Sequence, residues 1–363
     1  MLFPYKYVPH TIEKLQEYIN HLFLKVWCEA DGEYDIEKLH PELREIVLAI
    51  YYDDSIEKDH LYGPIKEIYD LFLKIKKGRR EALKKWYVNN NSIEDLCGNN
   101  NNCKPLQYKR LKQLYAELAP KIEAFFKSLF TEVIKLKAVC SRIGKIDEHY
   151  KAFMTENDEG KCPFCGINDV KGPYHTKRDA YDHYLPKNIY PFNSINFKNL
   201  APMCHECNSS YKTVKDPLYK PNHRDPLHTN SNNRRKAFYP YAEEQPEIII
   251  EIEIGNKDIN NISPDDIHLK ISSTKHADEI ETWKDIFGIE ERYKAKCCGK
   301  NDGKVWYQMI DDEFENAKTL SDAVSEPADL YQMTIRQASK YPYADANILK
   351  KPFLEACKKA GYF

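Results

Sequence analysis

Residues 162–208 of the chain read CPFCGINDVKGPYHTKRDAYDHYLPKNIYPFNSINFKNLAPMCHECN, and a pair of cysteines stands near each end of this segment. Each pair has CxxC spacing, and 38 residues lie between the pairs. Two thiolates in a tight turn can bind one edge of a metal ion, and two such turns complete the tetrahedron that Zn²⁺ favours. The sequence therefore predicts one zinc ion on a treble-clef-like site formed by Cys162, Cys165, Cys204 and Cys207.

All ligand positions of this predicted site are filled by cysteine, so no position stays open for water. We therefore expect the zinc ion to stabilise the fold and to take no part in chemistry. His205 stands between two ligands and is predicted not to bind the metal. A redox role for the CxxC pairs is disfavoured, because no βαβ pattern surrounds them.

The segment between the cysteine pairs carries residues suited to a second, catalytic metal ion. Asp182 offers a hard oxygen ligand for Mg²⁺ or Mn²⁺. His183 can accept a proton from water near neutral pH. Side chains of adjacent residues on an extended segment diverge, so one can bind the ion while the other faces water. Asn208 directly follows a zinc ligand, and its amide oxygen can supply a second hard ligand.

Together these residues resemble the zinc-stapled form of the HNH (ββα-metal) nuclease motif, CxxC…DH…N…CxxCN, over residues 162–216. The resemblance implies a β-hairpin followed by a helix that grips one divalent ion. It implies that Asp182 and Asn208 bind this ion and that His183 is the general base that activates water. Asn199 matches the central Asn of the motif and would brace the loop between the strands. The founding pattern has His where Asn208 stands, and the change favours Mg²⁺ or Mn²⁺.

A longer stretch resembles bacterial stand-alone HNH proteins of anti-phage systems, of which Septu-type systems are one example. It comprises residues 182–212, an Ile/Glu strand and the segment TWKDIFGIEERY at residues 282–293. In Septu-type systems the nuclease works beside an ATPase. The resemblance therefore implies a defence role and a partner protein, which is an ATPase or another component of the system.

The charge of the chain is distributed unevenly. The net charge is −2, but residues 161–240 contain 13 Lys or Arg against 6 Asp or Glu, so this part carries +7 and the remainder −9. A local basic region indicates a surface that faces an anion. The nuclease resemblance implies that this anion is nucleic acid, DNA more than RNA. Lys212 shares a predicted helix face with Asn208. We expect phosphate contacts from Lys212, Lys215 and Lys187.

Hydrophobic periodicity predicts an α+β fold that is mostly helical, in three regions. Residues 1–152 form a helical region that regulates the enzyme or binds a partner. Residues 153–222 form the HNH module, and residues 223–363 form a small β and helical region that packs on it. Alternating apolar residues predict paired strands at residues 248–254 and 267–271.

Helical spacing recurs at residues 12–26, 43–51, 65–86, 106–139 and 277–296, and from residue 311 to the end. We expect the fourth of these helices to break at Pro120. The Asn-rich run at residues 89–102 is typical of an exposed loop.

Bulk composition places the chain in the cytoplasm. No apolar run approaches the ~20 residues that a membrane span needs. The first residues lack the pattern of a secretion signal, and the 11 cysteines are an odd number, as expected for reduced thiols and metal ligands.

Two alternatives stay open. A second metal site could use Cys97, Cys103, Cys297 and Cys298. The protein could also be a zinc-stapled module that binds nucleic acid or a protein without cleavage. Such a module has no need for the combination of Asp182, His183 and Asn208, which favours the enzyme.

Overall fold

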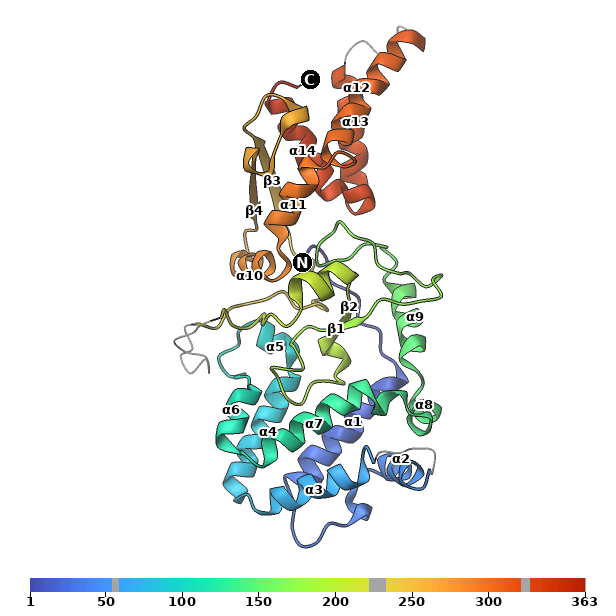
Figure 1. The fold of residues 1–363 in the computed structure, drawn as a ribbon, viewed down its shortest axis with the longest axis vertical. Coiled ribbons are helices and arrows are strands. Elements are labelled where there is room, and N and C mark those ends of the chain that lie inside the picture. Colours follow the sequence, from blue (N-terminus) through green and yellow to red (C-terminus); the bar gives the residue numbers. More distant parts are fainter. Residues whose placement is uncertain (54–58, 222–232, 321–326, 363) are drawn as a thin grey trace.

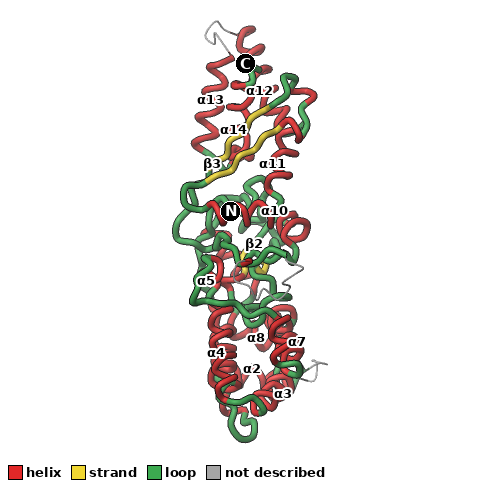
Figure 2. The backbone as a smooth tube through the Cα atoms, turned by 90° about the vertical axis from the view of Figure 1, so that its left-hand side faces the viewer, coloured by secondary structure: helices red, strands yellow, loops and turns green. Residues whose placement is uncertain are grey.

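The computed structural model describes residues 1–53, 59–221, 233–320 and 327–362. The molecule is elongated, with a helical body at one end, a smaller α/β lobe at the other, and the cysteine-rich segment between them (Figures 1 and 2). This arrangement confirms a mixed, mostly helical fold with small antiparallel sheets. In the described residues, no helix combines the length and the apolar character needed to span a bilayer.

Amphipathic helices form the N-terminal body. They are η1 (Thr11–Glu13), α1 (Lys14–His21), η2 (Leu22–Trp27), η3 (Ile36–Lys38), α2 (Pro41–Tyr51), α3 (Tyr62–Leu73), α4 (Lys77–Asn91), α5 (Ile93–Cys97), α6 (Tyr108–Leu114), α7 (Leu118–Thr131), η4 (Val133–Lys135), α8 (Lys137–Ile143) and α9 (Ile146–Glu156). Aromatic side chains fill their core: the Phe23 ring stacks on Tyr87 at 4.2 Å and meets Phe192 edge-on at 4.9 Å. Phe192 belongs to the cysteine-rich segment, so the helical body shares its core with that segment.

Two predictions for the N-terminal body were wrong in detail. Pro120 lies in the first turn of α7, where its missing N–H needs no helical partner, and the chain breaks before it. The run 89–102 is no exposed loop in its first half, because Asn89 and Asn90 are buried at the end of α4 and α5 follows directly. Their amides bond to the backbone of other segments, which compensates for the loss of water.

The cysteine-rich segment contains a small hairpin followed by a helix. β1 (Tyr181–His183) pairs antiparallel with β2 (Leu200–Pro202), so that Asp182 lies opposite Ala201. A short helix, η5 (Phe197–Asn199), leads into β2, and η6 (Glu206–Lys212) follows it. All residues of both strands are buried, so this hairpin lies inside the molecule.

The C-terminal lobe is built on the predicted strand pair, which the structure confirms. Its elements are β3 (Ile249–Ile254), η8 (Ile259–Asn261), η9 (Pro264–Asp266), β4 (Ile267–Ser272), α10 (Ala277–Phe287), α11 (Ile289–Cys298), α12 (Gly303–Leu320), α13 (Pro327–Lys340), η10 (Ala344–Ala346) and α14 (Asn347–Lys359). β3 and β4 are antiparallel, and α14 packs on β3. The helix predicted over residues 277–296 is divided by Gly288, whose φ is +58° and whose missing Cβ leaves room for the Tyr211 ring.

Candidate functional site

The four predicted zinc ligands converge. Cys162 and Cys165 lie in a turn, while Cys204 lies just before η6 and Cys207 lies in its first turn. All are buried, and their sulfur atoms lie within 4.8 Å of one another. The Sγ atoms of Cys165 and Cys204 are 3.9 Å apart. A tetrahedron with Zn–S bonds of 2.3 Å has edges of about 3.8 Å, so the cluster fits a structural zinc site.

Hydrogen bonds to the sulfur atoms complete the cluster. Arg292 of α11 places Nη1 3.2 Å from the Cys207 Sγ, and the Asn168 amide donates to the Cys204 Sγ at 3.7 Å. Four thiolates around one Zn²⁺ leave an excess negative charge, and the Arg292 guanidinium offsets part of it. Sequence reasoning missed Arg292, which lies 85 residues after Cys207.

Helices α10 and α11 also hold the first cysteine turn by its backbone. The Trp283 indole N–H donates to the Phe164 carbonyl at 2.7 Å, and the Tyr293 hydroxyl donates to the Cys165 carbonyl at 2.8 Å. All of these side chains are buried. The C-terminal lobe is therefore fixed to the cysteine cluster by three side chains of α10 and α11.

Asp182 and His183 stand next to each other on β1, and η6 reaches both through Lys212. The Lys212 Nζ lies 2.7 Å from the Asp182 Oδ2 and donates to the His183 carbonyl at 3.0 Å. Lys212 is fully buried and Asp182 is only 6% exposed. Burial raises the pKa of Asp182, and the Lys212 charge opposes this rise. The expected phosphate contact of Lys212 is therefore wrong, because its ammonium group is buried and paired with Asp182.

The His183 ring is held in one orientation. Its Nε2 lies 2.8 Å from the Ser194 carbonyl oxygen, which can only accept, so Nε2 carries the proton and Nδ1 is the basic nitrogen. The ring also packs edge-on against Phe130 of α7 at 4.5 Å. Burial, followed by the nearby Lys187 charge, lowers the pKa of His183 to about 3, below the near-neutral value expected from the sequence. His183 is therefore a neutral imidazole over the physiological pH range.

Asn199 joins the two ends of the connection between β1 and β2. Its Oδ1 accepts from the Leu185 N–H at 2.8 Å, and its Nδ2 donates to the Leu185 carbonyl at 3.0 Å. The Asn199 carbonyl also accepts from the Tyr184 N–H at 2.8 Å. Asn199 is fully buried, so these bonds are shielded from water. This placement matches the bracing position that the motif resemblance implies.

The other predicted residues occupy three different environments. Asn208 is half-buried on η6, one turn before Lys212. Lys187 is half-buried beside His183, with its Nζ 5.0 Å from the centre of the Phe130 ring. Lys215 is exposed, and its Nζ donates to the Asp285 and Ile286 carbonyls at the end of α10. Of the three predicted phosphate ligands, Lys187 alone lies beside the Asp182–His183 pair without an ion-pair partner among the described residues.

The N-terminal body fixes the loop that holds His183, a contribution that sequence reasoning missed. The Ser194 hydroxyl donates to the Phe126 carbonyl of α7, and the Asn193 amide donates to the Asn90 carbonyl at 3.1 Å. The Asn90 amide donates in return to the Pro191 carbonyl at 3.0 Å. The carbonyl that orients His183 is thus anchored to α7. The Asn-rich run after Val88 could have indicated this contribution, because buried Asn side chains usually form hydrogen bonds with the backbone of neighbouring segments.

The remaining cysteines give no second metal site. Within the described ranges, the four-cysteine cluster is the one group of His, Cys, Asp or Glu side chains close enough to hold an ion. Arg234 lies near Cys97 and Cys103 and donates to the carbonyls of Leu96 and Cys103. The alternative of a site built from Cys97, Cys103, Cys297 and Cys298 is therefore wrong.

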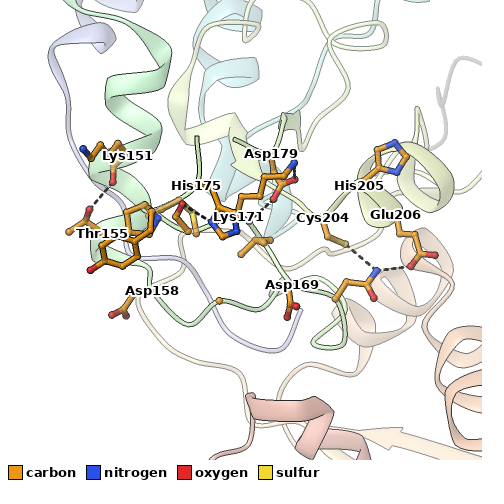
Figure 3. Close-up of a pocket in the computed structure, with 17 residues that line it drawn as sticks. Lys151, Thr155, Asp158, Asp169, Lys171, His175, Asp179, Cys204, His205 and Glu206 are labelled. Atoms are coloured by element: carbon orange, nitrogen blue, oxygen red, sulfur yellow. Dashed lines mark hydrogen bonds and ion pairs between the residues drawn. The ribbon is translucent and has the colours of Figure 1, made fainter. Parts of the chain in front are cut away.

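A large cavity opens beside Cys204, with a volume of about 1110 Å³. Lys171, Asp179, His175 and Glu206 are among its lining residues (Figure 3). Lys171 is paired with Asp179, since its N–H and its Nζ lie 2.7 and 3.3 Å from the carboxylate oxygens. Neither Asp182 nor His183 lines this cavity. The cavity is therefore separate from the aspartate–histidine pair.

Comparison with known proteins gives one informative match. No family model matches the chain, and no solved structure matches it. The chain is 29% identical over 76 residues to the Septu protein PtuB of Bacillus thuringiensis. The match covers 20% of this chain and 28% of PtuB, so the chain spans less than a third of that relative's length. The distant similarity to a Septu protein is thereby confirmed. The four-cysteine cluster is compatible with a zinc site.

Proposed function

We propose that the protein is an HNH-type endonuclease that hydrolyses phosphodiester bonds of nucleic acid, DNA more than RNA, in anti-phage defence. The observation that carries the proposal is the state of His183: a neutral imidazole, fixed by the Ser194 carbonyl so that Nδ1 is its basic nitrogen, beside the Asp182 carboxylate. A general base needs an unprotonated nitrogen held in a fixed direction, which Nδ1 provides, although the low pKa of the buried ring makes it a weaker base than a histidine in water.

The local architecture supports the same proposal. Two short strands are followed directly by a helix, and the second cysteine pair lies at the start of that helix. Asn199 braces the loop between the strands. An HNH module has this order of elements, and here a structural zinc ion would hold the helix against the hairpin.

The residues divide the chemistry between them. His183 would accept a proton from the attacking water at Nδ1, while the Ser194 carbonyl keeps the proton on Nε2. Asp182 and Asn208 offer carboxylate and amide oxygens, which suit one Mg²⁺ or Mn²⁺ ion. A divalent ion there supplies charge stabilisation for the phosphate and the leaving oxygen.

The protein offers few negative charges near Asp182, which favours a divalent ion that binds together with the nucleic-acid substrate. One oxygen of this single carboxylate is already paired with Lys212, so the protein offers little negative charge to a divalent cation. Mg²⁺ is often held by one or two carboxylates and by the phosphates of the substrate. We therefore infer that Asp182 and Asn208 would hold the ion weakly without substrate, and that ion and nucleic acid would bind cooperatively.

The similarity to the Septu protein PtuB supports the biological setting. The Septu-type systems that the sequence resembles combine a nuclease with an ATPase. We accordingly include a partner protein in the proposal, an ATPase or another defence component, with both proteins acting in the cytoplasm.

A second function is a zinc-stapled module that binds nucleic acid or a protein without cleavage. One observation favours it: Asp182 and His183 are only 6% and 8% exposed. A binding module can bury such a pair for stability alone, whereas a nuclease must admit a phosphate and a water molecule.

Divalent-ion dependence separates the two functions. Supercoiled plasmid and a single-stranded RNA are incubated with the purified protein in Mg²⁺, in Mn²⁺ or in EDTA. The proposal predicts nicking or cutting with either ion and none in EDTA. Binding of nucleic acid without cleavage under every ion condition would contradict the nuclease and support the binding module.

A further inference from the structure

Three lysines meet beside His183, and two of them come from the N-terminal body. Lys127 lies on α7 and Lys135 on η4, whereas Lys187 follows β1. The Phe130 ring connects them to the histidine, because it lies 5.0 Å from the Lys187 Nζ and 4.5 Å from the His183 ring.

Lys127 lies one turn before Phe130 on α7, and Lys135 follows in η4, so both lysines come from the segment that carries the ring beside Lys187. Desolvation, followed by the charges of Lys127 and Lys135, lowers the pKa of Lys187, and the Asp182 charge opposes the change. The effect of both lysine charges on Lys187 agrees with this placement.

Positive charge in this group exceeds the negative charge nearby. Lys127 pairs with Glu123 at 2.7 Å, but Glu123 also pairs with Lys112 at 2.8 Å. No ion pair among the described residues involves Lys135 or Lys187. A surplus of like charge on one surface attracts anions and costs stability when no anion is bound.

We propose that Lys127, Lys135 and Lys187 form a cationic strip that binds successive phosphates of a nucleic-acid strand beside His183. The N-terminal body then serves as one wall of the substrate site, in addition to the regulatory or partner-binding role expected for residues 1–152. This inference rests on the proposed nuclease function and identifies which part of the chain holds its substrate.

Lysine chemistry suits this task. An ammonium group contacts a phosphate as a point charge and reads no base, so the strip would position a strand without selecting its sequence. Contacts of this kind release counterions and make binding depend on salt. For duplex DNA, the slope of log K against log salt concentration is roughly −0.9 for each phosphate contacted. If each lysine contacts one phosphate, the salt dependence of binding measures how many of the lysines take part.

The test compares two double variants with equal changes of charge. The strip variant is Lys127→Gln with Lys135→Gln, which leaves Lys187 beside His183 in place. The control variant is Lys257→Gln with Lys300→Gln, two exposed lysines of the C-terminal lobe. Binding of a labelled 30-base-pair duplex DNA is measured by fluorescence anisotropy in EDTA at several salt concentrations, and cleavage is measured in Mg²⁺.

The strip variant should bind about tenfold more weakly, and the slope of log K against log salt should fall by about 2, while the control matches the wild type. Lys135→Gln alone should lower the slope by about 1. It provides a second test if the loss of the Lys127–Glu123 pair impairs folding. The same measurements with single-stranded RNA show whether DNA or RNA binds at the strip. Weaker binding of either polymer by the strip variant, but not by the control, supports the inference.

Equal binding by the strip variant, the control and the wild type would overturn this inference, and continued cleavage would leave the nuclease proposal intact. Equal weakening of both double variants would also overturn it, because the effect would then follow net charge alone. A wild type that binds no nucleic acid would overturn both proposals.

Discussion

Lys212 and Asp182 form an ion pair in the interior of the molecule, with the Lys212 side chain fully buried and the Asp182 side chain nearly so. Removal of two charges from water costs several kcal/mol per ion, and only their attraction and further hydrogen bonds offset this cost. Loss of one partner therefore has a larger effect on stability than loss of both.

We predict that Lys212→Met destabilises the protein by about 3–5 kcal/mol, because Asp182 is left buried without a counter-charge. Lys212→Met combined with Asp182→Asn should recover most of that loss. Urea denaturation of the single and double variants measures the difference. A loss below about 1 kcal/mol for the single variant would show that water reaches Asp182 freely.

His149 predicts a pH dependence of stability. Burial, followed by the neighbouring His10, lowers its pKa from 6.5 to about 4 in the folded chain. The unfolded chain therefore binds the proton more readily, so this residue has no effect above pH 6.5 and costs stability progressively as the pH falls towards 4. The loss at pH 4 is about 3 kcal/mol.

From pH 7 to pH 4, the free energy of unfolding of the wild type should decrease by about 3 kcal/mol more than that of His149→Phe. Urea denaturation at a series of pH values tests this. Parallel pH profiles for the two proteins would contradict the prediction and would mean that His149 is accessible to protons in the folded state.

Individual site residues differed in how well the sequence predicted them. The spacing of the cysteines was sufficient to select Cys162 and its three partners, which the structure brings together. The roles of Asp182, His183 and Asn199 stay predictions from the DH and N positions of the motif. Nothing in the sequence distinguished Lys212 from other lysines of the basic region, because its burial arises only when η6 packs on β1.

At the scale of elements, the cysteine cluster is held by the first cysteine turn, η6 and α11 together. Hydrophobic periodicity predicted most helices and the β3–β4 pair, since amphipathic patterns are local. It did not predict the break at Gly288, which depends on the Tyr211 ring of η6. It also missed Arg292, whose contact with Cys207 forms only when α11 reaches η6.

Arg292→Leu should lower the affinity for zinc by about 10- to 100-fold, because a group that hydrogen-bonds to a metal ligand is lost. Lys296→Leu is the matched control, since Lys296 lies on the same helix but pairs with Asp302. Chelator competition followed by elemental analysis measures retained zinc, with about one ion per chain expected at the outset. Equal zinc retention by both variants would show that Arg292 has no role at the cluster.

At the scale of the whole molecule, the parts at both ends contribute to the middle segment (Figure 1). The N-terminal body anchors the loop at residues 184–199, and the C-terminal lobe anchors the cysteine turns. The sequence predicted three regions, but the expected boundary at residues 222 and 223 lies outside the described residues. Contacts such as Asn90 to Asn193 join residues 103 positions apart, which no local pattern reveals.

The nuclease proposal depends most directly on His183. We compare the wild type, His183→Ala and the control His175→Ala, whose ring is exposed, after zinc content and urea denaturation have shown that all three are folded. Plasmid cleavage in Mg²⁺ and in Mn²⁺ and DNA binding in EDTA are measured for each. His183→Ala should cleave about 10²- to 10⁴-fold more slowly and bind DNA as the wild type does, because a general base acts on the reaction and not on binding. Equal cleavage rates for His183→Ala and the wild type would contradict the account.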